Sequence, residues 1–357
     1  MGGKPKALIA MSGGVDSSVA ALLPQRMGYD CVGATMKLFE NEDIGERSDR
    51  PCCSLADASD AARVAAALSM PHYVFDFTEA FRVDVIDRFA SSYEAGATPS
   101  PCIDCNTYLK FGRLFERART MGFDKIVTGH YARICPGANG RYTLERAADL
   151  QKDQTYFLYT MTQELLAHTL FPLGPLHKRE TRAIAAEAGF ANAEKRESQD
   201  ICFVASGDYA GFIEAYRGRA FKPGNFVDTS GRALGRHGGI ERYTIGQRKG
   251  LGIALGRPVF VKEIRPDANE VVLAEEAEVF ASSIEIQGVN LIAAPRPFPE
   301  RAQIMIRYNA RLVWAAVAPL PGGGLRAVFD EAVRAPAKGQ AAVLYDGGRV
   351  IGGGRIG

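Results

Sequence analysis

The first two hundred residues of this 357-residue chain alternate short apolar runs with segments of helical periodicity. The runs have the length of strands, and we expect strands at residues 7–11, 31–36, 73–77 and 125–128. Between them, apolar residues recur with the spacing of one helix face, as at positions 61–68. This alternation predicts an α/β domain with a parallel sheet and helices on both faces. Ligands of such sheets bind beyond the carboxyl ends of the strands.

The pattern changes near residue 205. Glycine and proline become frequent, long helical periodicity ends, and short β-type runs follow one another as far as residue 345. A chain of this length also suggests two or three domains, at roughly 150 residues per domain. We therefore expect an α/β domain at residues 1–204, a small β-rich central domain at 205–279 and a C-terminal β-barrel at 280–357.

Composition excludes several classes of protein. Hydrophobic residues make up 46% and charged residues 24%, as in globular proteins, and no apolar run approaches the ~20 residues that span a bilayer. No targeting signal is evident, and an odd number of cysteines, seven, favours reduced thiols and a cytoplasmic location. The formal charge of +2 gives no sign of a nucleic-acid partner, but residues 280–357 alone carry nine basic and five acidic residues. Eight of those nine are arginines, which suit bidentate phosphate contacts.

The loop after the first expected strand has the composition of a phosphate-binding turn. It reads Ser12-Gly-Gly-Val-Asp-Ser-Ser18 and leads into a helix, where backbone N–H groups and the helix N-terminus favour an anion. Asp16 is a candidate ligand for Mg²⁺ held against the phosphates. The spacing matches neither the usual nucleoside-triphosphatase loop nor the dinucleotide fingerprint. An ordinary glycine-rich turn is the alternative, and Pro24 is expected to interrupt the helix after about two turns.

Three cysteines stand in motif-like surroundings. Cys102 and Cys105 form a C-x-x-C followed by Asn106, which we expect to cap the next helix. A thiol near a helix N-terminus tends toward a lowered pKa and thus toward the nucleophilic thiolate. Cys202 follows much later, in Ser-Gln-Asp-Ile-Cys-Phe. A structural zinc site would require a second C-x-x-C or paired histidines, and the sequence has neither. For the C-x-x-C alone, buried packing thiols are the alternative.

These motifs resemble those of a known family. The loop resembles the pyrophosphate loop of the ATP pyrophosphatase superfamily, whose members cleave ATP between the α and β phosphates and adenylate a substrate oxygen. With the cysteine motifs, the chain is similar nearly end to end to the tRNA-specific 2-thiouridylases, bacterial enzymes that thiolate the wobble uridine. The other matching motifs are Cys52-Cys53-Ser54, Thr128-Gly-His-Tyr-Ala132, Lys152-Asp-Gln-Thr-Tyr-Phe157, Tyr243-Thr-Ile-Gly-Gln-Arg-Lys-Gly250 and Arg307-Tyr308. The resemblance implies an adenine nucleotide alpha hydrolase-like fold for the α/β domain.

The resemblance also implies a reaction. ATP, with Mg²⁺, adenylates the C2 oxygen of the uridine and releases pyrophosphate, and a persulfide on Cys202 then supplies sulfur as AMP leaves. Cys105 is implied as the second catalytic cysteine, which forms a disulfide with Cys202 as the sulfur is released. The implied partners are tRNA and a persulfide sulfur donor, either a cysteine desulfurase or a sulfur-carrier protein.

Three groups of site residues follow from the resemblance, residue by residue. The residues implied to bind ATP are Ala10, Met11, Ser12, Gly13, Gly14, Val15, Asp16, Ser17, Met36 and Gly129. Those implied to meet the target base are Ser100, Pro101 and Cys102. Those implied to contact tRNA are His130, Lys152, Asp153, Gln154, Arg307, Tyr308 and Gln340. Arginine would pair with phosphate and tyrosine would stack on a base.

Several alternatives stay open. Some members of the family have Asp at the position of Cys102, and three thiolates at Cys102, Cys105 and Cys202 would be enough to hold an iron–sulfur cluster with one open iron. Such a cluster would replace the persulfide relay. Another ATP-dependent adenylating ligase would share the loop, but it would need neither three separated cysteines nor a basic β-domain. A non-catalytic RNA-binding protein would leave the phosphate loop unexplained.

Overall fold

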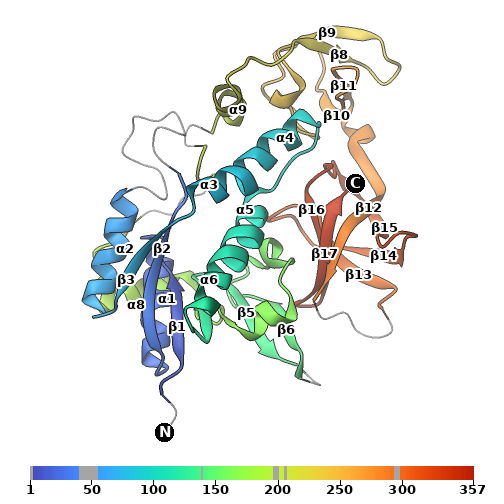
Figure 1. Ribbon diagram of the computed structural model, residues 1–357. Helices are drawn as coiled ribbons and strands as arrows, with labels where there is room; N and C mark the ends of the chain where they lie inside the picture. Colours follow the sequence, from blue (N-terminus) through green and yellow to red (C-terminus); the bar gives the residue numbers. More distant parts are fainter. Residues whose placement is uncertain (1–2, 40–54, 138–139, 196–200, 205–206, 293–297) are drawn as a thin grey trace. The chain divides into compact units, whose positions relative to one another are not determined.

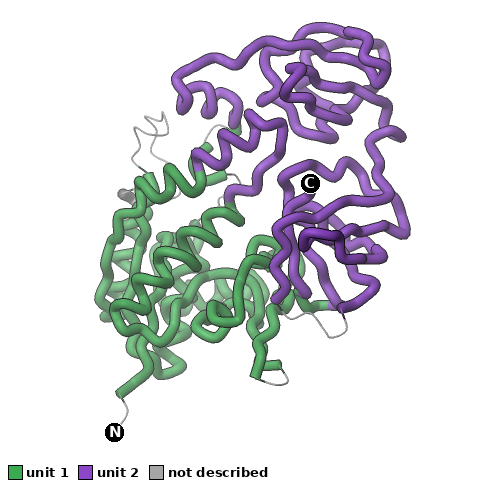
Figure 2. Tube along the Cα trace, turned by 45° about the vertical axis from the view of Figure 1, so that its right-hand side comes forward, with its two compact units in different colours: residues 1–85, 102–207, 348–350 green, residues 86–101, 208–347, 351–357 purple. Residues whose placement is uncertain are grey.

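The structure, a computed structural model, describes residues 3–39, 55–137, 140–195, 201–204, 207–292 and 298–357. These residues include no helix that is long and apolar enough to cross a membrane. The chain divides into two compact units, which Figure 2 shows in two colours. The first unit comprises residues 1–85, 102–207 and 348–350, and the second comprises residues 86–101, 208–347 and 351–357. Each unit has a hydrophobic core of its own.

Five parallel strands form the sheet of the first unit, in the order β3-β2-β1-β4-β7, and Figure 1 labels β1, β2 and β3 among them. They are β1 (Lys6–Ala10), β2 (Asp30–Lys37), β3 (His72–Asp76), β4 (Lys125–Val127) and β7 (Thr169–Leu170). The first four confirm the strands expected from the sequence. Ala7, Leu8 and Ile9 alternate between the two faces of β1 and are all fully buried, so the sheet is covered on both sides. The chain continues from β1 to β2 and β3 on one side and places β4 on the other, which makes the ends of β1 and β4 a topological switch point.

Helices and helical turns lie between these strands or follow the last of them. They are α1 (Val15–Arg26), α2 (Leu55–Ala67), α3 (Thr78–Phe81), α5 (Pro101–Asp104), α6 (Phe115–Thr120), α7 (Gln163–Ala167), α8 (Lys178–Glu187) and the 3₁₀ turn η4 (Thr155–Leu158). Two π-helical segments extend α3 and α5, namely η1 (Arg82–Asp87) and η2 (Cys105–Leu114). The α/β architecture expected for this part of the chain is confirmed.

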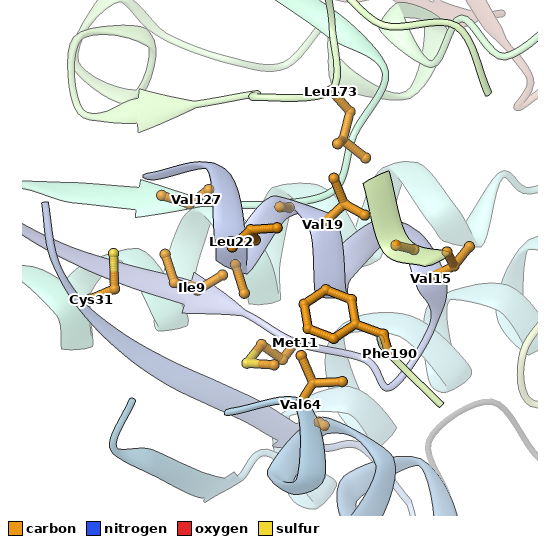
Figure 3. Close-up of a cluster of buried hydrophobic side chains, with 14 of the residues drawn as sticks. Ile9, Met11, Val15, Val19, Leu22, Cys31, Val64, Val127, Leu173 and Phe190 are labelled. Carbon is orange, nitrogen blue, oxygen red and sulfur yellow. The ribbon is translucent and has the colours of Figure 1, made fainter. Parts of the chain in front are cut away.

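One face of the sheet packs into the core that Figure 3 shows. Ile9 and Met11 from the end of β1 pack there with Val15 and Val19 from α1 and with Phe190 after α8. Apolar side chains on both sides of the loop between β1 and α1 therefore fix where that loop begins and ends.

The expectation that Pro24 interrupts the first helix is wrong. Helix α1 continues to Arg26, and Pro24 is buried in its last turn. A proline so close to the end of a helix removes one backbone hydrogen bond and leaves little helix beyond it to distort.

A short antiparallel hairpin in the first unit was not expected from the sequence. It consists of β5 (Ala132–Pro136) and β6 (Tyr142–Arg146), and residues 349 and 350 pair with β6. The hairpin follows directly after the residues that extend from β4, so it leads the chain away from the switch point.

The second unit contains a four-stranded sheet in the order β10-β11-β8-β9. Its elements are α9 (Tyr209–Arg217), β8 (Gly224–Val227), β9 (Ala233–His237), η5 (Ile240–Arg242), β10 (Phe260–Arg265), β11 (Glu270–Ala274) and η6 (Glu276–Val279). Phe226, Tyr243 and Val261 belong to its buried core. Helix α9 shows that helical structure continues slightly beyond the change in pattern near residue 205.

Six antiparallel strands close a barrel in the same unit, in the order β12-β15-β14-β13-β16-β17, with β17 paired back to β12. They are β12 (Phe280–Leu291), β13 (Arg301–Met305), β14 (Val313–Pro319), β15 (Leu325–Arg334), β16 (Ala341–Asp346) and β17 (Arg349–Ile356). The expected C-terminal barrel is confirmed. Strand β13 ends before Arg307 and Tyr308, which lie in the following turn.

The second unit also includes a segment from the middle of the expected α/β domain. Residues 86–101, with helix α4 (Arg88–Glu94), group with the β-rich part of the chain. We name this segment the arm. It directly precedes the C-x-x-C motif in the sequence.

Candidate functional site

The loop between β1 and α1 has the geometry of an anion site. Gly13 has a φ of +73°, and a Cβ atom there would lie 2.4 Å from the backbone oxygen of Asp57, so only glycine fits. Ser17 accepts a hydrogen bond from the N–H of Ser12 at 3.2 Å and donates one to the oxygen of Gly14 at 2.9 Å. These bonds fold the loop over the first turn of α1, whose N-terminal N–H groups favour negative charge.

Gly129 lies against the same helix end. A Cβ atom at Gly129 would come within 3.0 Å of the carbonyl carbon of Asp16 and 3.1 Å of the nitrogen of Ser17. Because β4 pairs with β1, the segment after β4 passes directly beside the start of α1, and glycine permits this close approach. The two expected ATP-binding segments, at residues 10–17 and at Gly129, are therefore brought together.

Asp16 is held by a lysine and a tyrosine. The ammonium of Lys178, the first residue of α8, lies 2.7 and 2.8 Å from the two carboxylate oxygens of Asp16. Tyr131 donates a hydrogen bond to one of the same oxygens at 2.9 Å. The Lys178 side chain is only 11% exposed, so this ion pair is weakly screened by solvent.

A second lysine and an amide hold the loop from the segment after α8. Asn192 donates to the oxygen of Gly13 and to the hydroxyl of Ser18, both at 2.9 Å. The ammonium of Lys195 lies 2.5 Å from Asp57 and 2.7 Å from Asp60, and 3.4 Å from the Gly13 oxygen. Two ammonium groups therefore flank the loop, which is the charge arrangement that phosphate groups require.

The remaining expected nucleotide residues lie at the carboxyl edge of the sheet. Ala10 ends β1, Met11 follows it, and Met36 is half-buried near the end of β2. Met11 donates its N–H to the oxygen of Ala34, which ties the start of the loop to β2.

The cysteine segment differs from expectation in its electrostatics. Helix α5 begins at Pro101, so Asn106 lies inside the helical segment and does not cap it. Cys102 is exposed, yet desolvation by the surrounding protein atoms, with a smaller contribution from the charge of Cys105, raises its pKa to about 11. Burial also raises the pKa of the half-buried Cys105. The expected lowering of these thiol pKa values is therefore wrong, because desolvation of the thiolate is the largest influence on both pKa values and raises them.

Cys202 lies half-buried in a turn. Among the described residues, which include all three cysteines of the trio, no three Cys, His, Asp or Glu side chains gather as a metal site would require. The trio does not fit an iron–sulfur cluster in this arrangement. The Cys52-Cys53-Ser54 motif lies outside the described residues.

His130 is a buried residue at the end of β4. The centroid of its ring lies 5.9 Å from the ring centroid of Phe111 and 5.6 Å from that of Phe171. Its Nδ1 lies 2.6 Å from the hydroxyl oxygen of Thr128. Burial, with a further contribution from the charge of Lys110, holds its pKa well below the usual value. The ring is therefore neutral, and its contact with tRNA stays a prediction.

The Lys152-Asp-Gln154 turn is built largely of internal contacts. Asp153 is buried and accepts hydrogen bonds from Arg146, from the N–H of Ala147 and from Thr155. Gln154 accepts the N–H of Tyr131 at 3.0 Å and donates its own N–H to the oxygen of Tyr131. These bonds connect the turn to Tyr131 and hence to Asp16. Lys152 is half-buried.

In the second unit, the expected base and tRNA residues occupy two places. Arg307 is exposed and Tyr308 half-buried, both in the turn after β13. Ser100 and Pro101 are buried at the end of the arm. The side-chain amide of Gln340 donates to the backbone oxygens of Thr98 and Pro99.

Sequence reasoning missed Lys178, Asn192 and Lys195. Each contacts the loop from more than 160 residues away along the chain, as the separations of the bonded pairs show. A lysine at the start of a helical pattern carries no local sign of such a contact, so the sequence alone offered no signal for it.

Comparison with known proteins adds three matching domain families and several close relatives. The tRNA methyl transferase HUP domain matches residues 5–206, the tRNA methyl transferase PRC-barrel domain matches 210–275, and the aminomethyltransferase beta-barrel domain matches 281–356. The tRNA-specific 2-thiouridylase MnmA of Clostridium beijerinckii is 47% identical over 354 residues, which cover 99% of each chain. The protein of the same name from Lachnoclostridium phytofermentans is 47% identical, and the match covers 98% of this chain and 99% of that protein. The one from Clostridium botulinum is 46% identical, and the match covers 99% of this chain and 98% of that protein.

Proposed function

Because the chain belongs to the tRNA-specific 2-thiouridylase family, we propose that it uses ATP to replace the C2 oxygen of the wobble uridine in tRNA with sulfur. The observation that carries the proposal is the phosphate loop at the switch point of a sheet whose unit also contains Cys105 and Cys202. Another adenylating ligase or a non-catalytic RNA-binding protein is not favoured, because neither would combine this loop with these cysteines and a basic barrel.

In the first step, the loop and its flanking lysines hold the phosphates of ATP. The C2 oxygen of uridine attacks the α-phosphorus, the α–β bridging bond breaks, and pyrophosphate leaves. Lys178 and Lys195 would neutralise the negative charge of the phosphates, and the N–H groups at the start of α1 would donate hydrogen bonds to them. Both lysines are paired with carboxylates in the absence of nucleotide, so binding exchanges one anionic partner for another.

Mg²⁺ fits this site by the type of donor. Magnesium is usually held by one or two carboxylates together with phosphate oxygens, and it neutralises phosphate charge when bound. Asp16 is the carboxylate beside the loop, and its ion pair with Lys178 would have to open for a metal ion to bind there.

In the second step, sulfur replaces the adenylated oxygen. The terminal sulfur of a Cys202 persulfide attacks C2, and AMP leaves with the bonding electron pair of the C2–O bond. The Cys105 thiolate then attacks the Sγ of Cys202, the persulfide S–S bond breaks, and its electron pair stays on the sulfur at C2. The product is 2-thiouridine with a Cys105–Cys202 disulfide, which a thiol reductant must reduce before a persulfide donor reloads Cys202.

We assign the other expected residues to positions around this chemistry. Ser100, Pro101 and Cys102 would border the target base, and Arg307 and Tyr308 would contact tRNA from the barrel. The α/β domain at residues 1–204 would carry ATP and sulfur, and the domains at 205–279 and 280–357 would carry tRNA. Cytoplasmic location and the identity of the sulfur donor stay predictions.

The proposal is tested with unmodified tRNA, ATP and a persulfide donor, followed by mass spectrometry of the nucleosides. We expect the unaltered protein to form 2-thiouridine and to release one AMP and one pyrophosphate for each 2-thiouridine. We expect Cys202→Ser to form no 2-thiouridine. Cys31→Ser is the matched control, because Cys31 is buried in the core and has no proposed role. Full activity of Cys202→Ser, or ATP hydrolysis without any thiolation by the unaltered protein, would contradict the proposal.

A further inference from the structure

The arm, residues 86–101, belongs to the second unit but directly precedes the C-x-x-C motif of the first unit. Its last residue, Pro101, opens helix α5 and is covalently joined to Cys102. The arm groups with the second unit, which contains the barrel. The arm lies between two π-helical segments, η1 at its start and η2 just beyond its end. Such segments are rare and occur most often at functional sites.

The turn between β15 and β16 of the barrel contacts the end of the arm. We name residues 337–340 of this turn the latch. The amide of Gln340 donates to the oxygen of Pro99 at 2.9 Å and to that of Thr98 at 3.2 Å. The N–H of Thr98 in turn donates to the oxygen of Lys338 at 2.8 Å. Two carbonyl acceptors require the N–H side of the amide to face the arm, so both of its donors are engaged there.

Gly339 permits this contact. It has a φ of +88°, and a Cβ atom there would lie 3.0 Å from the Cβ of Ala97 and 3.1 Å from the oxygen of Thr98. The backbone of the latch therefore packs directly on the backbone of the arm. The latch is itself tied to the last barrel strand, because Gly339 donates to the oxygen of Ile356 and Ile356 donates to that of Gln340.

The start of the arm is held by helix α9 of the same unit. Arg217 pairs with Asp87 at 3.0 Å and with Glu94 at 3.3 Å. The ring of Tyr93 stacks on that of Tyr209 with centroids 4.5 Å apart. Both ends of the arm thus contact other parts of the β-rich unit, and the chain continues from Pro101 into Cys102.

We propose that Gln340 is a positioning residue, which couples the barrel to the target-base segment Ser100–Cys102 by holding the arm through Thr98 and Pro99. The inference rests on the proposed function for the task of that segment, but the coupling itself follows from the contacts of the latch. A displacement of the barrel on binding tRNA is transmitted to the arm through three hydrogen bonds and the close contact at Gly339. The residues next to Cys102 therefore move together with the barrel.

The test compares Gln340→Met, which keeps the length of the side chain and removes both donors, with the unaltered protein. We expect hydrogen exchange at the Thr98 amide and alkylation of Cys102 each to rise about tenfold, the change that follows from losing hydrogen bonds of ordinary strength. We expect the single-turnover thiolation rate at saturating tRNA to fall about tenfold, because added tRNA does not restore the position of the arm. Gln303→Met, on a barrel strand outside the latch, should behave as the unaltered protein.

Gly339→Ala provides a second disruption of the same contact. If both variants act through the latch, the double variant should lose little more rate than the more severe single variant. A weaker Kd for tRNA with unchanged exchange and unchanged saturated rate would overturn the proposal, because it would make Gln340 a simple RNA contact. Unchanged behaviour in every measurement would overturn it as well. If the unaltered protein thiolates nothing, the proposed function fails, and exchange and alkylation still decide on the latch.

Discussion

Lys178 places a largely buried positive charge on the carboxylate of the loop between β1 and α1, and under the proposed function it is a principal contact for nucleotide. Its ammonium contacts both oxygens of Asp16 from the N-terminus of α8. Under the proposed function, a phosphate of the nucleotide replaces this carboxylate as the partner of the ammonium. Hydrogen bonds to charged groups contribute ~1.5–3 kcal/mol, which corresponds to roughly ten- to a hundredfold in affinity.

We therefore expect Lys178→Met to weaken ATP binding by roughly ten- to a hundredfold, measured by calorimetry with and without Mg²⁺. Lys262→Met is the matched control, because Lys262 is a lysine of the second unit in a longer, 3.7 Å pair with Glu278. The assignment of Lys178 would not survive if its variant bound ATP as tightly as the control does.

The thiols of the C-x-x-C give a prediction about pH. Burial raises the pKa of Cys102 to about 11 and also raises that of Cys105. At pH 8 only about a thousandth of Cys102 is thiolate, and this fraction rises tenfold with each pH unit. We expect its alkylation by iodoacetamide, assigned by peptide mass spectrometry without tRNA, to rise without levelling off between pH 7 and 10. A plateau below pH 8.5 would show that the thiolate is stabilised after all.

At this scale the sequence indicates candidate residues but not their surroundings. The loop and the three cysteines stand out because glycines, serines and cysteines in these patterns are unusual in sequence. The pKa of Cys102 depends instead on how many atoms surround it, and the partner of Asp16 depends on where α8 is placed. Both are properties of tertiary packing, which a local pattern does not contain.

At the scale of elements, glycines decide how closely the backbone segments approach. The strand β17 was not expected, because its Gly352-Gly-Gly354 centre lacks the β-branched residues that mark a strand. The structure explains the glycines, since a Cβ at Gly352 would lie 2.2 Å from the oxygen of Asn290 on the adjoining β12. The other barrel strands were predictable, because in β14 and β15 inward and outward residues alternate.

The phosphate loop offers a test of the same principle. Gly13→Ala places a methyl group 2.4 Å from the Asp57 oxygen at a φ of +73°. We expect a loss of ~1–3 kcal/mol in the free energy of unfolding, measured by urea denaturation, together with weaker ATP binding. Gly122→Ala is a matched control, because Gly122 has a φ of +76° with nothing within 4 Å of the added atom. It carries the conformational strain without the clash, so an equal loss of ATP binding in both variants would rule out the contact with Asp57 as the cause.

At the scale of the whole molecule, charge is divided between regions that the net value of +2 conceals. The Arg-rich residues 280–357 form a closed barrel, and their sequence predicted both the β-structure and the excess of positive charge. The grouping of residues 86–101 with the β-rich unit was not predictable, because nothing in the arm's own sequence distinguishes it from a connection within the α/β domain. It depends on partners more than a hundred residues away, such as Arg217 and Gln340.

The charge of the barrel leads to a prediction about salt. Arg307 is exposed in the turn after β13, and if it contacts a phosphate of tRNA, its removal should eliminate about one released counterion. We expect Arg307→Ala to weaken tRNA binding and to reduce the slope of log K against log salt by about one, measured between 50 and 300 mM salt, concentrations chosen to span roughly the physiological range. Arg265→Ala removes the same charge from the central sheet, where Arg265 is already paired with Glu263 and Glu270. Its slope should stay unchanged, because a guanidinium neutralised by two carboxylates releases no counterion from RNA. Equal slopes for the Arg307 variant and the unaltered protein would remove Arg307 from the tRNA surface, even if its affinity fell.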